Sequence, residues 1–137
     1  MRYIIFITVI VTMFVASFPT FSMIVGNTDE EVCTIADPML DNIFDGIKTE
    51  DYAKYSRDFD DTMREALPKK KFQKVNQEIR NQIGNYQYRE YLGFLNKNDM
   101  TIVLWKGRFD KTKDDILIKL VISKKDERYF VTGLWLQ

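Results

Sequence analysis

The sequence predicts an α+β fold in which three N-terminal helices pack on a curved four-stranded antiparallel sheet. Two observations lead to this prediction. Apolar residues recur at helical spacing through the first part of the chain, whereas an alternation with a period of two begins near residue 86 and continues to the end. Short polar clusters rich in Asn, Asp and Lys divide this second part into four segments, which is typical of hairpins.

A first helix is predicted over residues 28–47. Thr28 suits the N-cap position, and the three acidic residues that follow it favour the positive end of the helix dipole. Pro38 leaves two alternatives open. It either kinks one long helix or begins a second helix that Asp37 caps. In both cases the apolar positions share one face: Val32, Ala36, Met39, Leu40, Ile43, Phe44 and Ile47.

Three further helical segments are predicted before the sheet, so the helical segments number four although the fold class counts three helices. A short helix over residues 49–55 begins at Thr49, and a narrow stripe of Phe59, Met63 and Leu67 indicates another. The longest of the three runs from Pro68 to about residue 83. Its apolar positions lie on one face: Phe72, Val75, Ile79 and Ile83.

The four predicted strands cover residues 86–95, 100–109, 116–123 and 129–136. Strict alternation would place Glu90 on the same face as its aromatic neighbours Tyr86, Tyr88 and Phe94. In the last strand it would place Trp135 with Tyr129 and Val131, opposite Phe130, Leu134 and Leu136.

Both faces of this sheet are apolar over much of their length. In the second strand, Val103, Trp105 and Phe109 share one face, and the other face carries Met100, Ile102 and Leu104. A sheet with one solvated face would alternate apolar and polar residues instead. One face of the sheet can pack against the helices. The simplest way to bury the other face is to pack it against the sheet of a second copy of the chain. We therefore expect a homodimer through the outer sheet face.

Composition excludes several classes of function. The 137-residue chain has 45% hydrophobic and 29% charged residues, which is typical of a globular domain. Its formal net charge is zero, which argues against a general nucleic-acid binder. There is no histidine and a single cysteine, Cys33, so neither an intrachain disulfide nor a cysteine zinc site can form. We expect no metal and no cofactor.

The balanced charge hides an asymmetry between the two halves. Residues 27–66 contain twelve acids and four bases, a net charge of −8, whereas residues 67–137 contain fifteen bases and eight acids, a net charge of +7. The simplest interpretation is that the halves attract each other when they pack. The alternatives are a basic sheet surface and a mutual dimer contact.

The first 26 residues predict export. Arg2 precedes an almost wholly apolar run over residues 3–15, and the small residues Ser17 and Ser22 offer cleavage sites, so the pattern is that of a secretory signal peptide. The alternative is an uncleaved membrane anchor, because the apolar stretch is long enough to span a bilayer. Either interpretation places the domain of residues 27–137 outside the cytoplasm, secreted or membrane-anchored.

Three stretches of the sequence carry a resemblance to a known family. They read ADPMLDNIFDGIKTEDYAKYSRDFDDTMREALP, KFQKVNQEIRNQIGNYQ and RYFVTGLWLQ, with a turn at Glu50-Asp51-Tyr52 and a V-x-G-L-W element at residues 131–135. Over residues 35–137 the chain resembles domain-of-unknown-function family 3887. This resemblance implies a nuclear transport factor 2-like, or cystatin-like, roll, and it implies no established catalytic residues.

Rolls of this kind often hold a pocket between the helices and the concave sheet. Its expected lining is Tyr55, Phe59, Met63, Phe72, Tyr86, Glu90, Trp105, Phe109 and Trp135. A filled hydrophobic core is the alternative. The leading hypothesis is an exported, non-enzymatic binding module that holds a small apolar ligand. The alternative is an isomerase- or dehydratase-type enzyme using a buried carboxylate, for which Glu90 among aromatic residues is the candidate.

Overall fold

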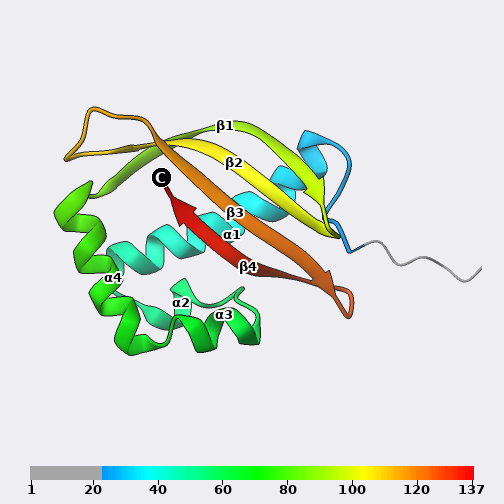
Figure 1. Ribbon diagram of the computed structural model, residues 1–137, viewed down its shortest axis with the longest axis horizontal. Coiled ribbons are helices and arrows are strands. Elements are labelled where there is room, and N and C mark those ends of the chain that lie inside the picture. The colour runs from blue at the N-terminus through cyan, green and yellow to red at the C-terminus, as the bar shows by residue number, and fades with distance from the viewer. Residues whose placement is uncertain (1–22) are drawn as a thin grey trace, which may run out of the picture.

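A computed structural model describes residues 23–137 and confirms the predicted fold class, helices followed by an open antiparallel sheet (Figure 1). The helices are α1 (Asp29–Thr49), α2 (Tyr52–Tyr55), α3 (Asp61–Ala66) and α4 (Lys69–Gln82). The strands are β1 (Tyr86–Lys97), β2 (Met100–Phe109), β3 (Ile116–Lys125) and β4 (Arg128–Leu136). The predicted cleavage sites and nearly all of the N-terminal apolar segment lie outside the described residues.

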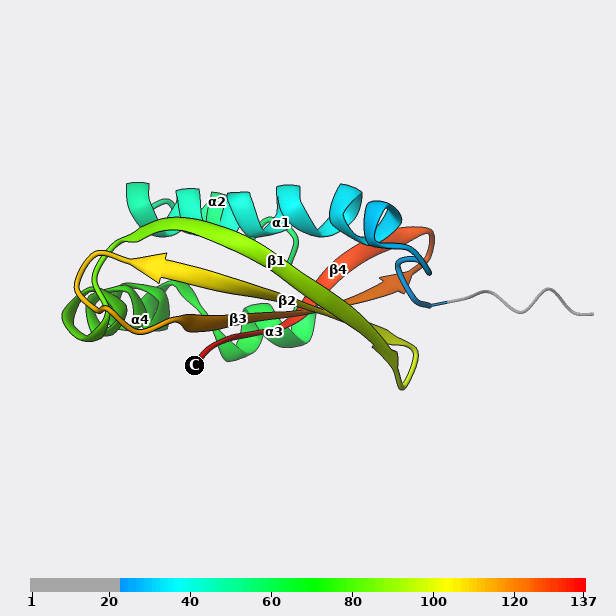
Figure 2. The same ribbon diagram turned by 90° about the horizontal axis from the view of Figure 1, so that it is seen from above.

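The sheet is a meander in which consecutive strands pair in the order β1-β2-β3-β4. Helix α1 runs along one side of it, α4 lies at one end, and α2 and α3 lie beyond the edge that β4 forms (Figures 1 and 2). Part of that edge is covered, since Phe59 forms a parallel bridge with Val131. The backbone N–H of Val131 donates to the Asp58 carbonyl at 2.7 Å, and the N–H of Asp60 donates to the Val131 carbonyl at 3.1 Å.

Helix α1 is a single helix that continues through Pro38, which settles the two alternatives that the sequence left open. Its start is a capping box in which Thr28 and Glu31 satisfy each other's backbone N–H groups. It ends at Glu50, whose φ of 57° and ψ of 33° are left-handed and turn the chain toward α2.

The core lies between α1 and the face of the sheet that packs against it, which we call the inner face. All four inward positions of β3 are buried, as are Val103, Trp105 and Phe109 of β2. From α1, the side chains of Val32, Ala36, Leu40 and Ile43 meet them at no more than 1% exposure. Helix α1 therefore contributes the long apolar stripe that its spacing predicted.

Three β-bulges change which side chains reach the inner face. Gln87 and Leu92 in β1 have no pairing partner on β2, and Thr132 in β4 has none on β3. Each extra residue reverses the alternation, because side chains in a strand point to opposite faces in turn. Tyr86 therefore points inward while Tyr88 pairs with Arg108 on the opposite, outer face.

The predicted faces of the first and last strands are wrong for this reason. Glu90 pairs with Lys106 on the outer face, whereas Phe94, beyond the second bulge, pairs with inward-facing Val103. In β4, Leu134 pairs with buried Leu120 and packs on the core, and Trp135 pairs with Lys119 on the outer face.

Ion pairs join the acidic and basic halves, as the charge asymmetry predicted. Arg89 of β1 contacts Asp37 at 3.1 Å and Asp41 at 2.7 Å, both on α1. Arg80 of α4 contacts Glu50 at 2.6 Å. These contacts attach the inner side of the sheet and the end of α4 to the same helix.

Candidate functional site

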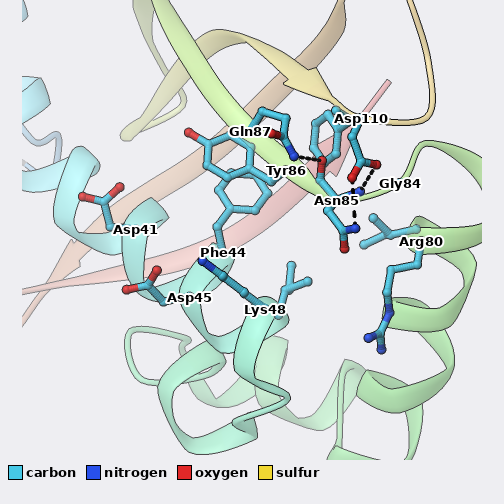
Figure 3. A pocket seen from close by; sticks show the side chains of 13 residues that line it. Asp41, Phe44, Asp45, Lys48, Arg80, Gly84, Asn85, Tyr86, Gln87 and Asp110 are labelled. Carbon is cyan, nitrogen blue, oxygen red and sulfur yellow. Dashed lines mark hydrogen bonds between the residues drawn. The ribbon is translucent and has the colours of Figure 1, made fainter.

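A cleft of about 630 Å³ opens where the second half of α1, the end of α4 and the start of β1 come together (Figure 3). Its lining combines aromatic and aliphatic side chains with acids, bases and amides: Asp41, Phe44, Asp45, Ile47, Lys48, Ile79, Arg80, Gly84, Asn85, Tyr86, Gln87, Phe109 and Asp110. Ligand sites commonly have this size and this mixture of an apolar wall with a few polar groups.

The floor of the cleft is aromatic. The rings of Phe44 and Tyr86 are stacked, with centroids 4.0 Å apart and planes 4° from parallel. Phe109 meets Tyr86 edge-on at 5.8 Å. Phe44 and Phe109 are buried and Tyr86 is partly exposed, so Tyr86 presents an apolar surface that a flat ligand group can cover.

The rim of the cleft is charged, and most of its charges are held by partners outside it. Asp45 binds Lys54 at 3.1 Å, and Arg80 binds Glu50 at 2.6 Å. Lys48 also lines the cleft and has no ion-pair partner among residues 23–137. It is therefore the cation best placed to meet an anionic group on a ligand.

One wall of the cleft is fixed by contacts between Asn85 and Asp110. The Asp110 carboxylate accepts hydrogen bonds from the Asn85 backbone N–H at 2.8 Å and from its side-chain amide at 3.1 Å. These bonds hold the pKa of Asp110 below its usual range. In return, the backbone N–H of Asp110 donates to the Asn85 carbonyl at 3.0 Å. The pair ties the start of β1 to the end of β2.

Five of the predicted pocket residues form part of the filled core: Tyr55, Phe59, Met63, Phe72 and Trp105. Their aromatic rings contact one another closely. The Tyr55 centroid lies 4.9 Å from that of Phe59 and 4.5 Å from that of Phe72. Burial and the neighbouring Tyr52 raise the pKa of Tyr55 to about 12. At these five positions the side chains are packed together, and Phe72 also borders a separate hollow beside α4.

The other four predicted residues separate into two pairs. Tyr86 and Phe109 line the cleft. Glu90 and Trp135 lie on the outer face, where Glu90 is paired with Lys106 at 3.1 Å and its side chain is 66% exposed. A carboxylate in this setting is not desolvated, so Glu90 is not a buried base.

Sequence reasoning missed Phe44, Arg80, Asn85 and Asp110 as site residues. The spacing places Phe44 only in the apolar stripe of α1 and does not show that it stacks on Tyr86. The pairing of Asn85 with Asp110 joins positions 25 residues apart. Glycine at position 84, before Asn85, was the one local signal, since its φ of 88° makes a sharp turn out of α4.

Other features of the described chain do not define a site. From residue 23 onward there is no group of three or more Cys, Asp or Glu side chains arranged to hold a metal ion. Cys33 is a free thiol whose pKa is raised by burial and by Asp37. Within the same residues, no helix has the length and apolar character needed to cross a membrane.

Fold and cleft together define a small α+β roll with an open ligand-sized cavity at one end of its sheet. The model for the family described as "Protein of unknown function (DUF3887)" matches residues 41–127, and the chain belongs to that family. The matched residues include α2, α3, α4 and the first three strands. No curated protein matches the chain.

Proposed function

We propose that this protein is an exported binding module whose cleft holds a small ligand with a flat apolar body and a polar or anionic end. The observation that carries the proposal is the Phe44–Tyr86 stack, which forms an aromatic floor inside a cleft of about 630 Å³. Lys48 at the rim supports an anionic end to the ligand. The chemistry needed is recognition alone, because the cleft positions no nucleophile against a general base.

A titration with 2-naphthoate tests the cleft, because this probe combines a flat apolar body with a carboxylate. In two-dimensional NMR spectra of the full-length protein, we expect saturable shifts at Gly84, Asn85 and Gln87. Tyr86→Ala should abolish them by removing the floor. Tyr88→Ala is the matched control, since Tyr88 is on the same strand but 62% exposed on the outer face. Shifts that do not saturate, or that survive Tyr86→Ala, would contradict the proposal.

We also propose that the module is a homodimer through its outer sheet face. This face exposes several large apolar side chains: Tyr88 at 62%, Leu95 at 56% and Trp135 at 44%. Charges of both signs lie toward one end of it, where Glu90 pairs with Lys106. A two-fold interface must be self-complementary, and an apolar centre beside paired opposite charges meets that requirement.

Sedimentation velocity of the full-length protein measures this association. Leu95→Asp should shift the dimer to monomer by placing a charge among the exposed apolar side chains of this face. Lys69→Asp, which changes the exposed start of α4, should leave the dimer intact. A wild-type monomer at micromolar concentration would refute this part of the proposal.

Export rests on the apolar segment that follows Arg2 in the sequence. Cells expressing the full chain can be fractionated and the mass of the protein measured in each fraction. This experiment distinguishes a cleaved signal peptide from an uncleaved membrane anchor. A chain that begins after Ser17 or Ser22 indicates a cleaved signal peptide, and an intact chain in the membrane fraction indicates an anchor. An intact chain in the cytosolic fraction would overturn export.

A further inference from the structure

Residues 23–27, which we call the strap, join the N-terminal apolar segment to α1 and are bonded to the sheet. The backbone N–H of Lys124 donates to the Met23 carbonyl at 2.9 Å. The backbone N–H of Val25 donates to the Thr101 hydroxyl at 2.9 Å, and the Val25 side chain is 9% exposed in the core. The strap is therefore part of the folded domain and does not act as a free linker.

The strap meets the sheet at the end of the molecule that lies opposite the cleft. The turns of the β1–β2 and β3–β4 hairpins are at the same end as the strap, whereas α4 is at the other (Figures 1 and 2). Strand β1 connects the two ends, since Tyr86 at its start lines the cleft and Lys97 at its end precedes a hairpin turn. A strand of its 12 residues spans up to about 36 Å.

The sequence before the strap has the length that a membrane span needs, with no spacer. The hydrocarbon core of a bilayer is about 30 Å thick and requires about 20 residues of helix. Residues 3–22 supply twenty and contain no charged side chain. In an anchored chain Met23 thus follows the span directly. One residue advances the chain by at most about 3.6 Å, and the headgroup layer is about 5–7 Å deep, so the bond to Lys124 brings the end of β3 into that layer.

Side chains at this end are suited to contact with lipid headgroups. Met23 is apolar but 44% exposed. Lys97, Lys125 and Arg128 are exposed and have no ion-pair partner within residues 23–137. Long basic side chains at a membrane interface place their methylene groups on apolar surroundings and their charge among the headgroups.

The charge at this end is too nearly balanced to hold it on a membrane by itself. The two turn regions, residues 97–100 and 124–128, contain four bases and three acids. The first turn of α1, which follows the strap, adds three more acids: Asp29, Glu30 and Glu31. Contact with lipid therefore depends on the strap and not on attraction to anionic lipids, so we expect it in neutral vesicles.

We propose that the strap and the two hairpin turns form a membrane-facing surface, which lies on the lipid headgroups when the apolar segment is in the bilayer. The aromatic cleft then opens at the far end of the domain, where dissolved ligands can reach it. This inference rests on the anchored form of the proposed export. It concerns how the domain sits on the membrane, and purified protein tests it independently of whether cells export the chain.

Fluorescence quenching in vesicles tests this surface. Full-length Cys33→Ser protein with one new cysteine is labelled with nitrobenzoxadiazole and reconstituted into phosphatidylcholine vesicles that contain a headgroup-nitroxide lipid. Lys125→Cys places the label at the proposed surface. Lys113→Cys is the matched control, an exposed lysine in the loop between β2 and β3 at the opposite end.

We expect quenching at least about fivefold stronger at position 125 than at position 113, at low and at high salt alike. Equal quenching at the two positions, or a difference that disappears at high salt, would overturn the inference. A full-length protein that does not float with the vesicles would overturn it as well.

An insertion tests the role of the strap. A flexible segment of about twenty Gly and Ser residues between Ser22 and Met23 leaves the bonds of the strap in place and adds about 25 Å of mean reach. We expect quenching at position 125 to fall to the level at position 113, and unchanged quenching would contradict the inference. The 2-naphthoate titration needs no vesicles, so a failure of the cleft proposal is distinguishable from a failure here.

Discussion

Trp105 and Trp135 are the two tryptophans of the chain, and they lie on opposite faces of one sheet. Trp105 is 1% exposed on the inner face, where Tyr91 meets it edge-on at 6.4 Å. Trp135 is 44% exposed on the outer face, where the Lys119 ammonium lies 4.8 Å from its ring centroid. The same residue type therefore serves as core in one place and as surface in the other. A single extra residue, Thr132, decides the placement of the second.

Truncation of these two residues should give the largest difference in the free energy of unfolding between an inner-face and an outer-face variant. Trp105→Ala removes a fully buried ring and should lower the free energy of unfolding by about 3–5 kcal/mol. Trp135→Ala should cost less than about 1 kcal/mol in the monomer, because nearly half of the side chain is already in water. Chemical denaturation at matched protein concentration measures both, and equal losses would contradict the assigned faces.

The second largest expected effect is a loss of folding stability at alkaline pH, caused by Tyr55 of the core. Because burial raises its pKa from 10.0 to about 12, the unfolded chain ionises first. The stabilisation is therefore fully present below pH 10 and is lost as the pH rises from 10 to 12. The loss amounts to about 3 kcal/mol.

Urea denaturation at several pH values measures this loss. Tyr55→Phe should remove that part of the pH dependence, whereas Tyr88→Phe, on the outer face, should retain it. A wild-type stability that stays flat from pH 10 to 12 would show that Tyr55 is accessible to solvent.

Substitutions at the neighbouring residues Arg89 and Glu90 should give a smaller difference in stability between the two faces. Arg89 is an inner-face residue whose side chain is 15% exposed and bound to Asp37 and Asp41. Arg89→Met should cost about 1–3 kcal/mol, because it removes charged hydrogen bonds from a half-buried site. Glu90→Gln breaks an exposed pair with Lys106 and should change stability by less than about 0.5 kcal/mol. Thermal unfolding of both variants checks the prediction, and a reversed order would contradict the register of β1.

The sequence contained enough information to predict the helices, the four strands and their antiparallel order. The polar clusters after residues 95, 109 and 123 predict the strand ends, and the structure ends these strands at residues 97, 109 and 125. What failed was the assignment of faces in β1 and β4. A bulge changes one pairing without a composition signal of its own. The bulges at Gln87 and Thr132 each reverse the faces of the residues beyond them, and the bulge at Leu92 restores the alternation that the bulge at Gln87 reversed.

The candidate site was predictable only in part. Tyr86 and Phe109 were expected from the aromatic pattern and line the cleft. Phe44 and Asp110 were not expected as site residues, because their roles depend on the angle at which α1 crosses the sheet and on a contact between distant turns.

Native mass spectrometry of the full-length protein, purified gently from the cells that produce it, tests the central claim most directly. The account predicts a dimer that carries an additional small mass, which Tyr86→Ala removes and Tyr88→Ala retains. A bare monomer in all three preparations would contradict both the ligand cleft and the paired outer faces.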